Sequence, residues 1–420
     1  MLKKPAEEGF VINSDNGENS ASKTKLNYGW VIVTLGLIAV VGAYGLGCLS
    51  YSIILPEMAD ALKLNWTEAG MLGTANLTGY LVYALLGGSL SSRYGTRKVM
   101  TYSLIMIGVT LFLTGLSTNF YHALLLRFLT GLFAGGVYIP AISLGAIWFS
   151  SKQRGMATGV VGAGSGAGIF ISGIIIPPIL YSRGWSASWI AMGLLVLAIY
   201  LLCFFLLRDH PQEKAQIEQK RNTPSSRKWS DIYRLPGIWS LGLVYIMHGF
   251  SYAVYATFFH AFLNTEMGLP ASQSATLWTF AGGISLITAV MWGGISDRLG
   301  RKYTLSFVYL VNATSYALFF FSGSMAGFYL SAILFGLVLG SIPTIVAASV
   351  ADQVGPKLVS TVMGFLTVFF GVGQLLGPVL GGYLADYSGS FRIAFAVAAL
   401  AAFLGAAGAL LRKTPLPEPE

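Results

Sequence analysis

Long apolar runs constrain this chain more than any other feature of its sequence. A bilayer core about 30 Å thick is crossed by a helix that rises about 1.5 Å per residue. Hydrophobic residues make up 55% of the 420 residues and charged residues 10%, which is too few charges to cover a soluble protein. The sequence therefore predicts an all-α membrane protein with twelve transmembrane helices, at 28–55, 67–90, 99–117, 121–148, 156–181, 186–207, 237–263, 272–292, 303–323, 327–350, 358–384 and 390–411.

The basic residues between these spans indicate an orientation. With the N-terminus inside, 22 of the 26 Lys and Arg residues fall on the inner side, three fall in outer loops and one, Arg127, falls within a span. Cytoplasmic loops of membrane proteins carry such an excess. We therefore expect both termini on the cytoplasmic side of a plasma (inner) membrane. The net charge of +9 is then explained without a nucleic-acid partner.

A short polar loop is predicted once in each half of the chain. The second copy is Gly293-Gly-Ile-Ser-Asp-Arg-Leu-Gly-Arg-Lys302, and the first is Gly88-Ser-Leu-Ser-Ser-Arg-Tyr-Gly-Thr-Arg-Lys98. Glycine allows a tight turn where two helix ends approach closely. The copies lie about half a chain length apart, and repeated halves are typical of transporters.

These loops resemble the signature loop that follows helix 2, and again helix 8, in the major facilitator superfamily. The second copy matches fully, whereas the first has Ser92 in place of the Asp and Thr96 in place of the first Arg of the pair. The resemblance implies two pseudo-symmetric six-helix bundles around a midplane cavity, which work by alternating access. The predicted parts are a disordered cytoplasmic tail at 1–27, bundles at 28–207 and 237–411, a cytoplasmic linker at 208–236 and a cytoplasmic tail at 412–420.

The same resemblance gives the two loops a gating role. The loop at 293–302 is expected to lock the cytoplasmic side in the outward-facing state, with Asp297 near Arg154. Because Ser92 replaces the Asp of the first copy, the lock of the first half is expected to be weaker. The residues assigned to gating are Gly88, Arg93, Gly95, Arg154, Gly293, Asp297, Arg298, Gly300 and Arg301.

Arg127 is predicted to lie inside the membrane, where a charge is costly and marks a candidate functional site. The stretch Arg127-Phe-Leu-Thr-Gly131-Leu-Phe-Ala-Gly135 resembles the helix-4 motif of the superfamily, which associates this Arg with proton-coupled transport. The alternative is a structural Arg that is hydrogen-bonded to a neighbouring helix. Both interpretations remain open at this point, and direct contact with substrate is less favoured than either.

A polar face is predicted on the span at 237–263. Tyr245, His248 and Tyr252 recur at helical spacing and share this face, and Tyr255 lies near it. Histidine changes charge near neutral pH, which suits a proton carrier or an anion contact. The alternative is a buried neutral His bonded to a carbonyl. His260, near the outer interface, is assigned a structural role.

Further candidates for substrate binding or proton coupling come from other spans. In the family that this chain resembles, the first helix of each three-helix repeat lines the cavity, and tyrosines there would combine hydrogen bonding with apolar contact. The alternative for each aromatic residue is ordinary helix packing. The candidates are Tyr44, Tyr51, Asn76, Tyr138, Trp278 and Gln374.

Two further patterns concern the helices themselves. Asn65 followed three residues later by Glu68 predicts a capping box at the start of the second span. Glycines recur at 159, 162, 164, 166 and 168, and again between Gly371 and Gly382. Such runs permit helices to cross closely and to bend.

The charge of the cavity indicates a substrate class. No Asp or Glu lies at mid-depth in a predicted span, so Arg127 and a protonated His248 leave the cavity neutral to positive. This favours an anion such as a small carboxylate, or a neutral amphiphile. The stretch Asn27-Tyr-Gly-Trp-Val-Ile-Val33 resembles the start of bacterial monocarboxylate and oxalate/formate porters. Those porters carry basic residues in helices 8 and 11, whereas the corresponding spans here have none in their interiors.

The sequence therefore predicts a secondary active transporter, most simply a proton-coupled symporter of a small organic anion. The alternatives are a proton-coupled exporter of an apolar or cationic compound and a transporter-like ligand receptor. No catalytic constellation, metal-ligand cluster or phosphate-binding loop emerges, so neither an enzyme nor a cofactor is expected. The expected partners are a small-molecule substrate, protons and the lipid bilayer, and the protein is expected to act as a monomer.

Overall fold

The computed structural model describes residues 18–149, 151–209, 237–354 and 359–412. Within these ranges the chain is nearly all helical and forms no strand. The elements of the first half are α1 (Glu18–Val40), the π-helix η1 (Val41–Leu49), α2 (Tyr51–Ala61), α3 (Trp66–Tyr94), α4 (Thr96–Thr114), α5 (Phe120–Trp148), α6 (Ser151–Gly162) and α7 (Gly164–Leu206). Those of the second half are α10 (Ile238–Ala261), η2 (Phe262–Glu266), α11 (Ala271–Leu299), α12 (Arg301–Phe321), α13 (Met325–Val338), α14 (Ser341–Val354), α15 (Val359–Ser388) and α16 (Phe391–Leu411).

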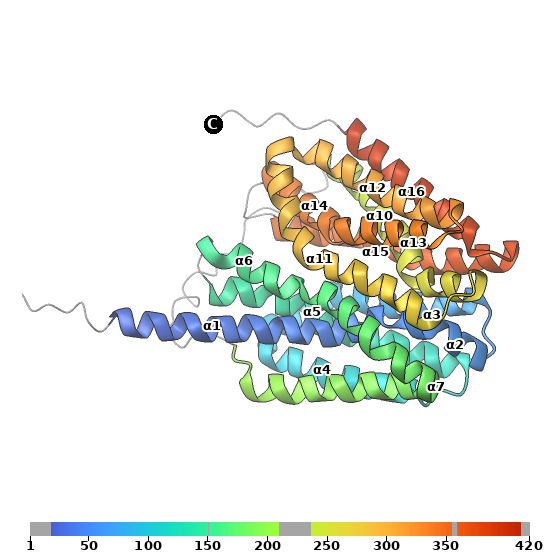
Figure 1. Cartoon of the computed structure of the whole chain (residues 1–420). Helices are drawn as coiled ribbons and strands as arrows, with labels where there is room; N and C mark the ends of the chain where they lie inside the picture. Colours follow the sequence, from blue (N-terminus) through green and yellow to red (C-terminus); the bar gives the residue numbers. More distant parts are fainter. Residues whose placement is uncertain (1–17, 150, 210–236, 355–358, 413–420) are drawn as a thin grey trace, which may run out of the picture.

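Twelve membrane passes follow from these elements, as predicted. Nine helical segments of the described residues are long and apolar enough to cross a bilayer. One of them, Gly155–Leu206, contains two passes, because Gly184 has non-helical backbone angles (φ 78°, ψ −178°) and divides α7. The remaining two passes are α3 and α11, each of 29 residues. Figure 1 shows the two halves of the chain lying side by side along their lengths.

Three features of the helices differ from those predicted from the sequence. Residues 18–27 were expected in a disordered tail, but they belong to α1, which no proline interrupts and which extends by one hydrogen bond per added residue. The first pass changes from α1 to the π-helix η1, and the tenth pass is broken between α13 and α14. The predicted linker lies outside the described residues from position 210 onward.

The two ends of the molecule differ in their turns. We call "basic end" the end that carries the turns at 93–98 and 298–302, and "opposite end" the end that carries Asn65, Asn119 and Ser324. At the opposite end, the predicted capping box is confirmed: Asn65 accepts from the Glu68 backbone N–H at 2.8 Å, and the Glu68 carboxylate accepts from the Asn65 N–H at 3.0 Å. The side chains of Asn119 and Ser324 cap α5 and α13 by accepting from the backbone N–H groups of His122 and Gly327.

Glycines let the helices approach closely. A Cβ atom on Gly131 of α5 would lie 1.7 Å from the carbonyl oxygen of Asn76 on α3. Gly45 of η1 and Gly168 of α7 face each other, since a Cβ on either would lie 2.3 Å from the Cα of the other. The predicted role of the glycine-rich stretch in close helix crossing is confirmed for Gly164, Gly166 and Gly168.

Hydrogen bonds between the two halves gather toward the opposite end. The carboxylate of Asp386 on α15 accepts from the backbone N–H groups of Trp66 and Thr67, at 2.9 and 2.8 Å. It therefore sits at the N-terminus of α3, where the helix dipole favours a negative charge. The hydroxyl of Ser52 lies 2.7 Å from Nδ1 of His260, and the hydroxyl of Thr74 donates to the carbonyl of Leu375 at 3.0 Å. We call these contacts the inter-half seal.

The close contact at Gly131 predicts a stability effect. Gly131→Ala should lower the apparent unfolding temperature of the detergent-purified protein by about 1–3 °C, because overpacking at a close helix crossing costs roughly 1–3 kcal/mol. Gly364→Ala is the control, since nothing lies within 4 Å of a Cβ at that position of α15. Equal unfolding temperatures for the two variants, measured by a thermal melt, would show that α3 and α5 are not packed in this manner.

Candidate functional site

A cavity of about 260 Å³ lies between the two halves. Four stretches of the first half (η1, α3, α5 and α7) and three of the second half (α10, the break in the tenth pass with the start of α14, and α15) contribute side chains to it. We call it the central cavity. Its lining is Tyr44, Leu49, Leu77, Tyr80, Tyr138, Ser165, Ile169, Tyr245, His248, Tyr252, Leu339, Gly340, Pro343, Thr367, Phe370 and Gln374. No acidic or basic side chain other than His248 is among these residues.

Three tyrosines form the wall that the first half contributes. The ring centroids of Tyr44 and Tyr138 lie 5.3 Å apart, and Tyr80 lies 6.1 Å from Tyr44 and 6.2 Å from Tyr138. They come from η1, α3 and α5, so three separate helices position them. We call this cluster the tyrosine wall. Tyr44 and Tyr138 were predicted from the sequence, whereas Tyr80 was missed.

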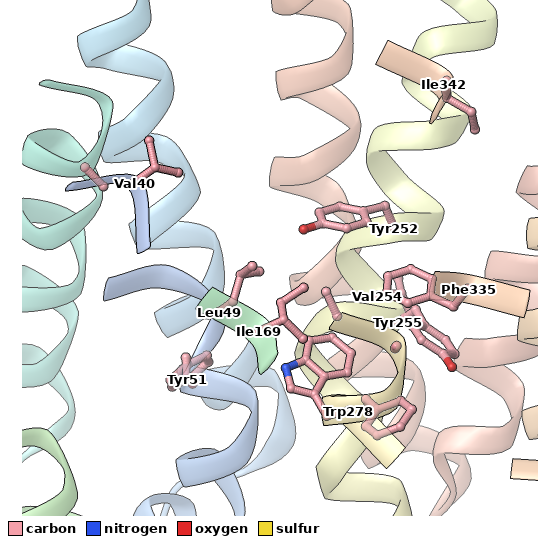
Figure 2. Packing of buried hydrophobic residues seen from close by; sticks show 14 of the residues in the cluster. Val40, Leu49, Tyr51, Ile169, Tyr252, Val254, Tyr255, Trp278, Phe335 and Ile342 are labelled. Carbon is pink, nitrogen blue, oxygen red and sulfur yellow. The ribbon is translucent and has the colours of Figure 1, made fainter. Parts of the chain in front are cut away.

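His248 lies in the wall that the second half contributes. Its ring stacks on Phe370 at 5.4 Å and on Tyr245 at 6.0 Å, and Tyr252 lies 5.9 Å away. The predicted polar face of this helix therefore exists, and Figure 2 shows Tyr252 reaching from α10 toward the first half. We call Tyr245, His248, Tyr252 and Phe370 the histidine wall. His248 is 6% exposed and makes no side-chain hydrogen bond with any described residue.

Arg127 lies beside the cavity rather than in its lining. Its Nη1 donates to the carbonyl of Gly47 at 2.8 Å, and its Nη2 lies 3.5 Å from the carbonyl of Cys48. Both acceptors belong to η1, where the wider π-helical turn alters the regular backbone bonding and leaves carbonyls for other donors. The guanidinium also lies over the rings of Tyr51 at 4.6 Å and Trp189 at 5.2 Å. Its side chain is 1% exposed and pairs with no carboxylate among the described residues.

A smaller cavity of about 40 Å³ borders this arginine and shares four lining residues with the central cavity. Arg127, Tyr51 and Asn76 line the smaller cavity, and Tyr44, Leu49, Leu77 and Tyr252 line both. The side chain of Asn76 already has a hydrogen-bond partner, because its Nδ2 donates to the backbone carbonyl of Arg127 at 3.0 Å. The hydroxyl of Tyr51 donates to the carbonyl of Ala69 at 2.6 Å. The structure thus brings Arg127, Tyr51 and Asn76 together next to the central cavity.

Two predicted site residues lie elsewhere. Tyr255 is ten residues beyond Tyr245, which places it about 80° around the helix from that face. It packs inside the second half, where its hydroxyl lies 2.8 Å from that of Ser331. Trp278 is buried against Phe259 and His260. Neither lines a cavity described above, so the structure does not bring them together with the other candidates, and their role in substrate binding stays a prediction.

The predicted gating loops are shorter than expected. Gly88 and Gly293 lie within α3 and α11, and only Gly95 and Gly300 form the turns, with φ of 85° and 86°. Left-handed backbone of this kind favours glycine. Arg93 and Arg298 are exposed in the last turns of these two helices. The side chain of Arg154, the expected partner of Asp297, lies outside the described residues.

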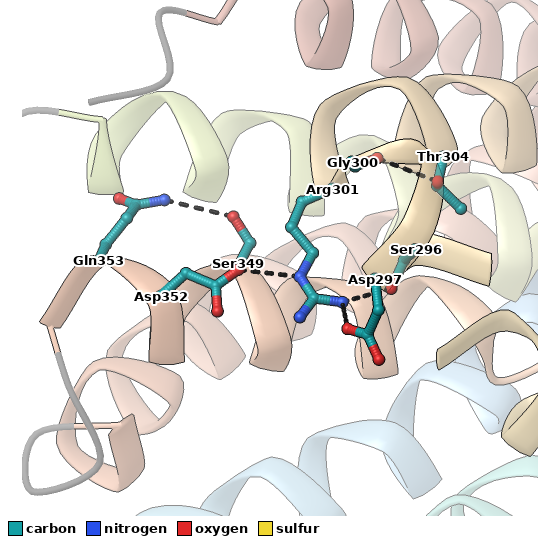
Figure 3. Close-up of polar contacts among 8 residues, drawn as sticks. All are labelled: Ser296, Asp297, Gly300, Arg301, Thr304, Ser349, Asp352 and Gln353. Atoms are coloured by element: carbon teal, nitrogen blue, oxygen red, sulfur yellow. Dashed lines mark hydrogen bonds and ion pairs between the residues drawn. The ribbon is translucent and has the colours of Figure 1, made fainter. Parts of the chain in front are cut away.

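Arg301 is the centre of the polar contacts at the second turn (Figure 3). It pairs with Asp297 at 2.5 Å and with Asp352 of α14 at 2.9 Å, and it donates to the hydroxyl of Ser296 at 2.5 Å. The guanidinium therefore ties the ends of α11 and α12 to the end of α14. Asp352 was missed from the sequence, because its contact with Arg301 joins residues about fifty positions apart.

The first turn has a different acidic partner. Asp209, which follows α7, accepts from the backbone N–H of Arg97 at 2.6 Å, and Arg97 itself donates to the carbonyl of Phe204 at 2.7 Å. A carboxylate from another part of the chain thus stands at the start of α4. This contact was also missed from the sequence, where Ser92 in place of an Asp led us to expect a weaker lock in the first half.

The role of Arg301 predicts a local change in dynamics. Arg301→Gln should increase hydrogen–deuterium exchange severalfold in peptides that cover 296–304 and 349–353, because the charged fork that joins these segments is lost. Arg298→Gln is the control, since Arg298 forms no ion pair with the described residues. Unchanged exchange in Arg301→Gln would contradict a joining role for this side chain.

Comparisons with known proteins identify the family. A model of the family described as "Uncharacterised MFS-type transporter YbfB" matches residues 40–410. Among similar proteins, the probable sulfoacetate transporter SauU of Cupriavidus necator is 22% identical, over 60% of this chain and 61% of its own length. The cis,cis-muconate transport protein of Acinetobacter baylyi is 25% identical, over 72% and 75%. The hexuronate transporter of Bacillus subtilis is 26% identical, over 67% and 66%. The chain thus matches between about three fifths and three quarters of the length of these relatives.

Solved structures agree on the fold. A bacterial homolog of the human lysosomal transporter Spinster, in an inward-facing and occupied conformation, matches with a TM-score of 0.71. The match covers 92% of this chain and 98% of that one, at 16% identity. With twelve passes in two six-helix bundles around a central cavity, and with the family match over residues 40–410, this chain belongs to the family of MFS-type transporters typified by YbfB, within the major facilitator superfamily.

Proposed function

We propose that this protein is a secondary active transporter that carries a small organic anion together with protons by alternating access. The observation that carries this proposal is the guanidinium of Arg127, buried beside a cavity whose described lining contains no carboxylate. A buried cation without an acidic partner raises the electrostatic potential around it, because the low dielectric of the interior screens it weakly. An anion that enters the central cavity gains from this potential, whereas a cation does not.

The relatives support an organic anion. Their names specify sulfoacetate, cis,cis-muconate and hexuronate. Each of these compounds carries a carboxylate or a sulfonate. We extend this substrate class, and none of the individual compounds, to the present chain.

His248 is our candidate for the coupled proton. Among the residues that line the central cavity, it is the one whose type ordinarily titrates near neutral pH. Its ring has no hydrogen-bond partner among the described residues, so a proton gained there is not held by a neighbouring carboxylate. A bound anion next to the ring would stabilise the protonated form, which links the uptake of the proton to that of the anion.

The proposed orientation follows from the loop charges. We place the basic end, and both termini, in the cytoplasm, with the protein in the inner membrane and acting as a monomer. The inter-half seal then closes the outer side, and the central cavity belongs to an inward-facing state. In the outward-facing state the two turns at the basic end would approach each other and replace the seal. The bundles at 28–207 and 237–411 are the rocking units of this proposal.

The test uses purified protein in liposomes that contain a pH-sensitive dye. Sulfoacetate, cis,cis-muconate, glucuronate and benzoate are added outside, each with and without a proton gradient. At least one of them should cause protein-dependent acidification of the interior. His248→Ala should remove this signal, whereas His122→Ala should keep it, because His122 is exposed at the start of α5 and is not among the residues that line the cavity.

Three results would contradict the proposal or a part of it. Acidification that persists in His248→Ala would remove this residue from the coupling step. If no anion acts while a lipophilic cation releases stored protons, the protein is an exporter, and the electrostatic argument is wrong. Specific binding of an anion without any flux would instead indicate a transporter-like receptor.

A further inference from the structure

The tenth pass is interrupted where it borders the central cavity. α13 ends at Val338, Gly340 has a φ of 78°, and α14 begins at Ser341. Leu339, Gly340 and Pro343 all line the cavity. Backbone that leaves the helical conformation at membrane depth is tolerated only where it is buried in protein or lines a cavity. The position of the break therefore presents the first turn of α14 to whatever occupies the cavity.

The first turn of a helix attracts negative charge. Its N–H groups lack partners within the helix, and the helix dipole adds a partial positive charge there. Anions bind at helix N-termini for this reason, and interrupted helices of other transporters aim such ends at anionic substrate groups. α14 has 14 residues, enough for a developed dipole.

Two buried polar side chains point independently to a ligand in this cavity. His248 is 6% exposed and Gln374 is 4% exposed, and both line the cavity. Neither makes a side-chain hydrogen bond with any described residue. Buried polar groups are normally hydrogen-bonded, so these two are available to a ligand that supplies the missing partners.

The aromatic lining restricts the shape of that ligand. The tyrosine wall comes from the first half and the histidine wall from the second, so the cavity has aromatic rings on both sides. Aromatic rings stack favourably with planar π-systems, beyond the gain from buried area. The cavity of about 260 Å³ is slightly smaller than the roughly 300–1,000 Å³ of common ligand pockets, so the ligand is small.

We propose that the central cavity binds a planar carboxylate, aromatic or conjugated, whose carboxylate group lies at the break before α14 and whose planar part lies between the tyrosine wall and the histidine wall. This inference rests on the proposed function, since it names the substrate class of the same site. It assigns the direct contact with the anion to the first turn of α14, with His248 and Gln374 completing the hydrogen bonds. Arg127 acts on the anion only through its electrostatic potential. Its guanidinium is already hydrogen-bonded to η1 and lies over the rings of Tyr51 and Trp189.

The test compares charge and size at one position of the first turn. Pro343→Asp places a negative charge there, and Pro343→Asn is the matched neutral control. Binding of benzoate and of its uncharged analogue benzamide is measured calorimetrically on the purified, full-length protein. Pro343→Asp should weaken benzoate binding about tenfold or more, because it removes the favourable interaction with the helix N-terminus. Benzamide binding should change to the same extent in the two variants, and Pro343→Asn should weaken benzoate binding much less than Pro343→Asp does.

Several outcomes would overturn the inference. If Pro343→Asp and Pro343→Asn weaken benzoate binding equally, the size of the side chain determines the affinity and its charge does not. Cyclohexanecarboxylate that binds wild-type protein as tightly as benzoate would remove the requirement for a planar ligand. If benzoate does not bind while sulfoacetate or glucuronate is transported, this inference fails and the proposed function stands. If no carboxylate binds or is transported, the proposed function itself fails.

A second variant pair keeps the test decisive if Pro343→Asp does not fold. Gln374→Glu changes one atom of a side chain in the cavity lining, and Gln273→Glu makes the same change on the exposed start of α11. At a pH where the new carboxyl is ionised, Gln374→Glu should weaken the binding of benzoate severalfold and change the binding of benzamide much less. Unchanged benzoate affinity in Gln374→Glu would place the anion outside this cavity.

Discussion

The need to satisfy backbone polar groups inside the bilayer governs this structure. A helix meets that need by itself, so a departure from helical bonding survives only where other groups or a cavity take up the freed carbonyls and N–H groups. Two departures flank the central cavity. η1 in the first half contributes Tyr44 and Leu49 to it, and the break before α14 in the second half contributes Leu339 and Gly340. The functional region is thus built where the regular helices stop.

Arg127 explains how the first of these departures is kept. Its guanidinium bonds the carbonyl of Gly47 in η1 and lies over the rings of Tyr51 and Trp189. This one side chain therefore connects α5 with η1, α2 and α7. Hydrogen bonds to carbonyls and contacts with ring faces offset part of the cost of burying the charge, and no carboxylate among the described residues neutralises it. A structural role and an electrostatic effect on the cavity are then properties of the same residue, and the two interpretations open at the level of sequence do not exclude each other.

The sequence was sufficient for the features that depend on local patterns. Twelve passes follow from apolar length, the capping box follows from Asn65 and Glu68, and the shared face of Tyr245, His248 and Tyr252 follows from helical spacing. The rest depends on contacts between distant segments. The bond between Ser52 and His260, and the position of Asp386 at the start of α3, join residues of opposite halves. Gly340 is one of 51 glycines, and the local sign of a break was the proline three residues after it, a residue favoured in the first turn of a helix. The π-helix is hidden, because its residues are as apolar as those of the helix before it.

The position of a bound ligand is the most direct test of this account. A crystal of the protein soaked with 4-bromobenzoate would give an anomalous signal from the bromine, and electron density for the carboxylate. We predict the ring between the tyrosine wall and the histidine wall, with the carboxylate next to Gly340 and the bromine directed away from it. A carboxylate bound directly to Arg127, or a bromine signal outside the central cavity, would contradict the account.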